Sequence, residues 1–194
     1  MKIRIHKILK QTKVEGPNTR YCIWFQGCSR HCKGCWAKAT WDFNAGKEYK
    51  VEDILADILK TPNIDGVTFL GGEPFEQSEA LDFLSREIKK AGLSVVCFTG
   101  NSIENIQNKH QSILKNIDLL IDGEYKQDET DYSRPWVGSK NQRYHFLTDK
   151  FDESILKEYK NKIEINIQKN GMIFINGMGD FEKFSNNLNM FIRH

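Results

Sequence analysis

Three cysteines lie within eight positions of the stretch FQGCSRHCKGCW, residues 25–36. Cys28, Cys32 and Cys35 have the spacing C-x₃-C-x₂-C, and no fourth cysteine lies nearby. Iron–sulfur clusters are held by cysteine thiolates, and three of them can hold three irons of a [4Fe–4S] cube. The fourth iron then stays open to bind another ligand. An open position at a metal is typical of a catalytic centre.

Other chemistries are open to these cysteines. A structural zinc site needs four protein ligands, so His31, Cys22 or Cys97 would have to complete it. Cys22 and Cys97 alternate with apolar neighbours in strand-like stretches, which is typical of small core residues, and His31 is typical of a solvated loop. A nucleophilic cysteine is a further alternative. A disulfide framework is disfavoured because the chain holds an odd number of cysteines, five. The pattern favours the cluster.

The composition indicates a soluble globular protein. Of 194 residues, 39% are hydrophobic and 28% charged, and the net charge is +2 with both signs interspersed. Nothing here requires a nucleic-acid or membrane partner. No apolar run approaches the roughly 18 residues of a membrane span, and the start MKIRIHKILK lacks the apolar region of a signal peptide. We therefore expect a cytoplasmic protein with neither partner.

Strand-like and helix-like stretches alternate along most of the chain. The apolar patterns predict strands over 21–26, 65–72, 93–100 and 117–123, and helices over 51–60, 77–92 and 102–116. This alternation predicts βαβ units with a parallel sheet, either part of a barrel or an open doubly wound sheet. The cysteine loop and the segments 71–74, 99–100 and 122–125 each follow a predicted strand. Because such loops share one edge of a parallel sheet, we expect them to converge there.

The residues after Asp149 have a different character. The pattern predicts a helix over 151–162, strands over 163–168 and 171–177, and a closing helix over 180–194. We therefore divide the chain into a core, residues 1–150, and a small C-terminal α+β extension, residues 151–194. The alternating isoleucines need a surface to bury against, so the extension should dock at the rim and shape the substrate entrance; they are Ile163, Ile165, Ile167, Ile173 and Ile175.

The cysteine motif, followed one strand later by Gly71-Gly72-Glu73-Pro74, resembles the radical S-adenosylmethionine (SAM) superfamily. Over residues 10–147 the chain also resembles the anaerobic ribonucleotide reductase activating proteins; the matching segments are 14–41, 71–75, 99–100, 121–125 and 134–143. It departs from them at Asn18 and Asn101, and it continues for about fifty residues past the family's usual end. The resemblance implies an α/β fold, a partial (β/α) radical SAM barrel with a parallel sheet flanked by helices.

The resemblance also implies the cofactors and their contacts. Cys28, Cys32 and Cys35 would ligate a [4Fe–4S] cluster whose open iron binds SAM, and the chemistry would be carried by the cluster and SAM rather than by a catalytic side chain. A larger side chain in place of Gly72 should then prevent SAM binding and leave cluster binding intact. The expected SAM-binding residues are Gly71, Gly72, Glu73, Pro74, Thr99, Gly100 and Trp36.

Four of the assignments near the site have a structural alternative. Glu73 and Asp122 would either contact ligands or cap turns, and Trp36 would either stack near adenine or pack in the core. The segment 134–143 would be either an interface loop, through Arg134, Trp136 and Arg143, or a structural one.

The function implied is reductive cleavage of SAM to a 5′-deoxyadenosyl radical, which generates a glycyl radical on a partner anaerobic ribonucleotide reductase. A flavodoxin- or ferredoxin-like protein would donate the electron. One alternative is a stand-alone radical SAM enzyme that modifies a peptide or a small molecule. A second is a non-catalytic iron–sulfur or zinc scaffold.

Overall fold

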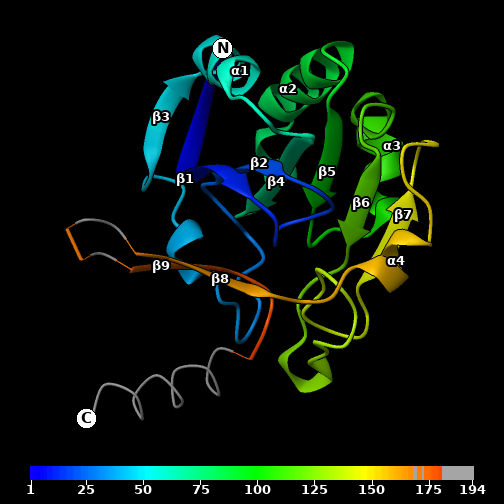
Figure 1. The fold of residues 1–194 in the computed structure, drawn as a ribbon. Helices are drawn as coiled ribbons and strands as arrows, with labels where there is room; N and C mark the ends of the chain where they lie inside the picture. The colour runs from blue at the N-terminus through cyan, green and yellow to red at the C-terminus, as the bar shows by residue number, and fades with distance from the viewer. Residues whose placement is uncertain (168–169, 172, 181–194) are drawn as a thin grey trace.

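The computed structural model describes residues 1–167, 170–171 and 173–180, and its centre is a seven-stranded sheet (Figure 1). The order is β3-β1-β2-β4-β5-β6-β7. The strands are β1 Lys2–Thr12, β2 Arg20–Phe25, β3 Lys47–Lys50, β4 Gly66–Gly71, β5 Ser94–Phe98, β6 Leu119–Asp122 and β7 Arg143–Phe146. The four central strands β2, β4, β5 and β6 are parallel, as predicted, whereas β1, β3 and β7 run antiparallel to their neighbours. The fold is therefore α/β with a parallel centre.

Three helices cover one face of this sheet (Figure 1). They are α1 Val51–Lys60, α2 Ser78–Lys90 and α3 Ile103–Leu114, close to their predicted ranges. Helix α1 buries Val51, Ile54 and Ile58, a stripe with helical spacing, against the sheet. Short 3₁₀ helices span Lys38–Thr40, Pro74–Gln77 and Gln127–Glu129. None of the helices in the described part of the chain is long and apolar enough to cross a membrane.

The other face of the sheet packs against loops and the start of the extension. Val96, Leu119 and Ile121 contact a cluster completed by Trp136, Val137 and Phe151. The predicted helix over 151–162 is only one turn, α4 Ile155–Glu158. The chain becomes extended at Tyr159, whose ring packs on Trp136, so tertiary contacts end the helix.

Beyond α4, the antiparallel hairpin of β8 Ile163–Ile167 and β9 Ile173–Gly177 confirms the two predicted strands. It docks on the core through its polar face: the Thr12 hydroxyl donates to Glu164 and accepts from Asn176. Four isoleucines on the other face are 39–72% exposed, namely Ile165, Ile167, Ile173 and Ile175. The expectation that the isoleucines form the docking surface is therefore wrong for these four, because buried polar groups of the core take that place, whereas Ile163 is partly buried. The helix expected over 180–194 lies outside the described residues, Asp180 excepted.

Candidate functional site

The three clustered cysteines lie in the loop that follows β2. Their thiols are free and partly buried, and all three line one cavity of about 690 Å³. Backbone hydrogen bonds close the loop, from Gly27 N to Thr40 O (2.7 Å) and from Cys28 N to Trp41 O (3.1 Å). The Gln26 side chain, which the sequence did not single out, donates to two further carbonyls of the same loop. These bonds hold the thiols beyond the carboxyl end of β2.

The two cysteines outside the loop do not join the three inside it. In the described residues, no three Cys, His, Asp or Glu side chains are gathered closely enough to share one ion. The two remaining cysteines, Cys22 and Cys97, are fully buried and do not line the cavity. Burial raises the pKa of both thiols well above the usual range. Their prediction as core residues is confirmed, and neither is placed to complete a zinc site.

The segment Gly71-Gly72-Glu73-Pro74 is bonded directly to the cysteine loop. Gly72 N donates to Phe25 O and Glu73 N donates to Gly27 O, both at 2.9 Å. Gly71 has a φ of +102°, and a Cβ on Gly72 would lie 2.3 Å from Gly27 O. The glycines thus permit the close approach of two backbones. Bulk at Gly72 should therefore disturb the cysteine loop too, contrary to the expectation that it would spare the cluster.

Glu73 connects the carboxyl end of β4 to that of β5 through hydrogen bonds. Its buried carboxylate accepts hydrogen bonds from Thr99 Oγ1 (2.8 Å), Gly100 N (2.9 Å) and Phe75 N (3.1 Å). Burial raises the pKa of Glu73, although these bonds and the charge of Arg30 oppose the rise. Both oxygens are engaged by the protein, so the structure favours the capping role of Glu73. Pro74 is buried at the start of the 3₁₀ helix and is not part of the cavity wall.

Arg30, between the first two cysteines, connects the cysteine loop to three strand ends. Its guanidinium donates to Asn101 Oδ1 at 2.6 Å and lies 3.8 Å from both Glu73 Oε2 and Glu124 Oε2. It also packs on Gly100, where a Cβ would lie 2.4 Å from Arg30 Cδ. Sequence reasoning did not find this residue; its place between two predicted ligands was the available signal. The expected convergence of the strand ends is thus present, and Thr99 and Gly100 line the cavity.

The aromatic residues of the loop have different environments. Trp36 is 59% exposed at the cavity wall, so packing in the core does not account for it. Trp41 stacks on the exposed His31 ring, with centroids 4.5 Å apart. Trp36 is therefore accessible to a ligand, whereas His31 is a loop residue as expected.

Asp122 is a structural residue. It is fully buried, accepts from Ile103 N (2.7 Å) at the start of α3, and binds Arg143 Nη2 at 2.6 Å. Burial alone would raise its pKa, but the bonds to Arg143, Ile103 N and His145 outweigh it and lower the pKa. Asp122 does not line the cavity, so the turn-capping role is the one the structure supports.

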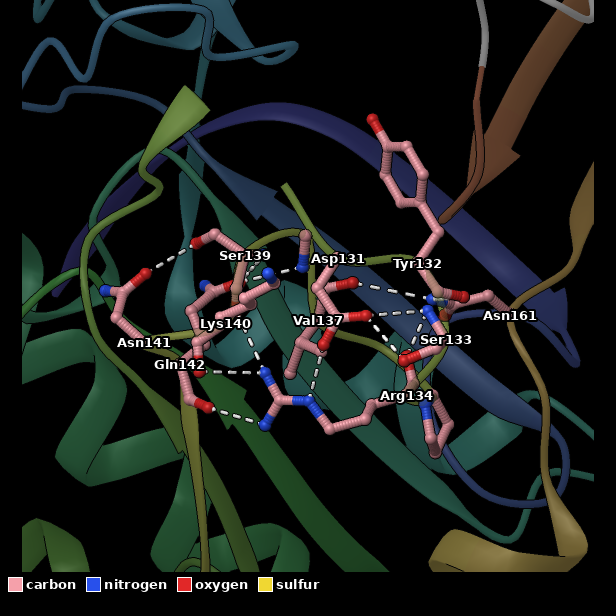
Figure 2. A network of polar contacts seen from close by, with 12 residues as sticks. Asp131, Tyr132, Ser133, Arg134, Val137, Ser139, Lys140, Asn141, Gln142 and Asn161 are labelled. Atoms are coloured by element: carbon pink, nitrogen blue, oxygen red, sulfur yellow. Dashed lines mark hydrogen bonds and ion pairs between the residues drawn. The ribbon is translucent and has the colours of Figure 1, made fainter. Parts of the chain in front are cut away.

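The segment 134–143 folds on itself (Figure 2). Arg134 binds the Asp131 carboxylate at 2.7 Å and donates to the carbonyl groups of Ser139, Lys140 and Gln142. Trp136 is buried, and its backbone N–H donates to Asn161 Oδ1 at 2.7 Å. Asn161 also donates to the carbonyls of Tyr132 and Arg134. Because Arg134 is hydrogen-bonded within the segment and the Trp136 ring is buried, the structure favours the structural alternative over an interface loop.

Another wall of the cavity comes from β1, the loop after it, and the hairpin. His6, Lys7 and Glu15 line it together with residues 174–179. Glu15 is 4% exposed and accepts from Gly177 N at 2.7 Å. Burial raises the pKa of Glu15 to about 7, although the bonds to Gly177 and Asn176 and the charge of Lys7 lower it. Sequence reasoning did not find this wall, because its residues are far apart in the chain.

Comparisons with known proteins agree with this geometry. The family model described as a 4Fe-4S single cluster domain matches residues 14–145. Proteins named anaerobic ribonucleoside-triphosphate reductase-activating protein are similar: that of Salmonella typhi is 30% identical over 75% of this chain and 99% of its own length, and that of Vibrio cholerae 32% identical over 70% and 92%.

A crystal structure of QueE from Escherichia coli overlaps 52% of this chain and 54% of its own, with 24% identity and a TM-score of 0.45, a likeness that supports no conclusion. The family match and the curated relatives are sufficient by themselves to assign the chain to a family. The stretch that the family model matches contains the three clustered cysteines together with Gly71 and Gly72, and all five residues line one cavity. The chain belongs to the family of anaerobic ribonucleoside-triphosphate reductase-activating proteins and contains a 4Fe-4S single cluster domain.

Proposed function

We propose that the protein reductively cleaves SAM and generates a glycyl radical on a partner anaerobic ribonucleotide reductase. The observation that carries this proposal is the meeting of three free thiols, the Gly71-Gly72 turn and the Thr99-Gly100 turn on one cavity. Cys28, Cys32 and Cys35 would ligate the cluster. When bound, cluster and SAM supply one-electron cleavage of the sulfonium to a 5′-deoxyadenosyl radical.

The residues of the chain bind and orient these groups. The backbone of Gly71 and Gly72 would approach the methionine part of SAM without steric hindrance from side chains, and Thr99 and Gly100 would border the same ligand. Glu73 and Arg30 position these turns relative to the cysteines through the contacts described above. Trp36 is the exposed aromatic surface available to adenine. No side chain of the protein is assigned a proton transfer or a covalent step.

The fold and the partners of this activity are proposed with it. Residues 1–150 would form the partial radical SAM barrel, and residues 151–194 an extension that borders its substrate entrance. The reductase partner is supported by the names of the relatives. The electron donor would be a flavodoxin- or ferredoxin-like protein.

One observation favours a second candidate function. Residues of β9 line the cavity, and they lie beyond the stretch 14–145 that the family model matches. A cavity wall built from residues beyond that stretch would suit a stand-alone radical SAM enzyme acting on a peptide or a small molecule. The two functions share the cofactors and differ in the acceptor of the radical.

The test is anaerobic incubation of the reconstituted protein with SAM and reductant, with and without the anaerobic reductase of the same genome. We expect 5′-deoxyadenosine in both cases and a glycine-centred EPR signal only with the reductase. Cys32→Ala should abolish both products, whereas Cys97→Ala, a matched change outside the cavity, should retain them. Stoichiometric zinc without sulfide would refute the cluster; 5′-deoxyadenosine without the EPR signal would favour the second function.

The role of the extension is tested by truncation. Phe151 and Asn161 pack into the core, so the informative truncation ends at Lys162 and removes only the hairpin and the residues after it. We expect the shortened protein to cleave SAM without a partner and to act poorly on the true target. Loss of the cluster would instead make the hairpin part of the core fold.

A further inference from the structure

One buried acceptor at the hairpin wall has no partner. Asn176 of β9 is 6% exposed and lines the cavity that also contains the cysteine thiols. Its Nδ2 donates to Thr12 Oγ1 at 3.1 Å, whereas its Oδ1 accepts no hydrogen bond from the described residues. A buried acceptor without a partner is costly, and it commonly marks a place where a ligand completes the bonding.

A fixed ammonium group lies at the same wall. Lys7 Nζ is 5.1 Å from the ring centroids of both Trp24 and Phe174, and it makes no hydrogen bond or ion pair with the described residues. Phe174 is two residues from Asn176 on the same face of β9. The cavity therefore presents a hydrogen-bond acceptor, a cationic donor and two aromatic rings in one region.

The charges at this wall select against ionic ligands. Glu164 accepts from the Thr12 hydroxyl to which Asn176 donates, and its carboxylate would repel an anion, while Lys7 would repel a cation. A neutral group that carries a donor and an acceptor side by side satisfies both open positions. The peptide amide is such a group, because its N–H and C=O lie on adjacent atoms.

We propose that Asn176 and Lys7 form a substrate subsite that binds a backbone amide of an inserted peptide segment. The amide N–H donates to Asn176 Oδ1, and the C=O of the same or the adjacent peptide unit accepts from Lys7 Nζ. This inference rests on the proposed function, in which the segment is the glycine-bearing stretch of the reductase. Lys7 of β1 and Asn176 of β9 both lie outside the stretch 14–145 that the family model matches.

The experiment compares Asn176→Leu and Lys7→Met with a matched control, Asn166→Leu. Asn166 occupies the same face of the hairpin, on β8 opposite Phe174, but does not line the cavity. Each cluster-loaded variant is assayed for 5′-deoxyadenosine without a partner, for the KM of the reductase in glycyl-radical formation, and for melting temperature. Binding of acetyl-Gly-Gly-Gly-amide to the SAM-bound protein is measured by anaerobic calorimetry.

We expect both cavity variants to raise the KM of the reductase and to weaken binding of the peptide about tenfold, which is the effect of one hydrogen bond. SAM cleavage without a partner should be unchanged. Asn166→Leu should change none of these. An unchanged KM and peptide affinity in Asn176→Leu and Lys7→Met would overturn the subsite, as would an equal loss in the control.

If the wild-type protein cleaves SAM but forms no radical on the reductase, the proposed function fails. The peptide measurement then decides the subsite alone. Peptide binding that Asn176→Leu weakens and Asn166→Leu does not still supports the subsite, and a wild-type protein that does not bind the peptide overturns it.

Discussion

Replacing Glu15 by Gln should stabilise the protein at alkaline pH and change little at pH 5. The carboxylate is buried beside the hairpin, and its pKa is raised from 4.5 to about 7, chiefly by burial. Glutamine has nearly the same shape and keeps an acceptor for Gly177 N, which now donates to Glu15 at 2.7 Å. The substitution therefore removes the charge while retaining the contact.

The sign and the size of this change in the free energy of unfolding follow from proton linkage. Between pH 4.5 and about 7 the folded state binds more protons at Glu15 than the unfolded state, so stability falls as the pH rises through that interval. The shift from 4.5 to about 7 is about 2.5 units, and at about 1.36 kcal/mol per unit the ionised carboxylate costs about 3 kcal/mol above pH 7. Glu15→Gln should recover this amount at pH 8.

The assay is urea unfolding of the anaerobic, cluster-loaded protein at pH 5, 6, 7 and 8, compared among wild type, Glu15→Gln and Glu158→Gln. Glu158 is exposed on α4 and serves as the matched control. The free energy of unfolding of Glu15→Gln relative to wild type should rise with pH, while that of the control should stay flat. Equal pH slopes in wild type and Glu15→Gln would refute the reasoning.

Three further outcomes are expected. Gly72→Val should lose iron together with SAM binding, because its Cβ would lie 2.3 Å from Gly27 O; full iron and sulfide content would contradict this. Cys22→Ala and Cys97→Ala should each retain about four irons and cost on the order of 1 kcal/mol of stability in denaturant unfolding; loss of the cluster in either variant would remove the ligand assignment. Asp122→Asn should lower the free energy of unfolding by about 2 kcal/mol, through its weakened bonds to a cation and a helix N-terminus, and leave partner-free SAM cleavage intact. A drop in cleavage without a drop in stability would show that Asp122 contacts the ligand.

Features set by local spacing could be predicted from the sequence. The cysteine motif and the strand ends of the parallel centre are examples. Helix α1 is another, because its apolar stripe predicted its range residue for residue; the stripe is Val51, Ile54, Leu55, Ile58 and Leu59. Strand β1, Lys2–Thr12, was not predicted, because its lysines and polar residues give it a weak pattern. Its identity comes from pairing with β2 and β3, which lie far from it in sequence.

The sequence by itself limited the chemistry of the site, because three thiols in one short loop and glycines after the next strand restrict what can bind there. Only the tertiary structure decided the roles that depend on distant partners. It gave Glu73 three protein donors and made Arg30 the link between strand ends. It also turned the polar face of the hairpin toward the core, because Thr12 and Glu15 are buried there and require hydrogen-bond partners that isoleucine does not offer.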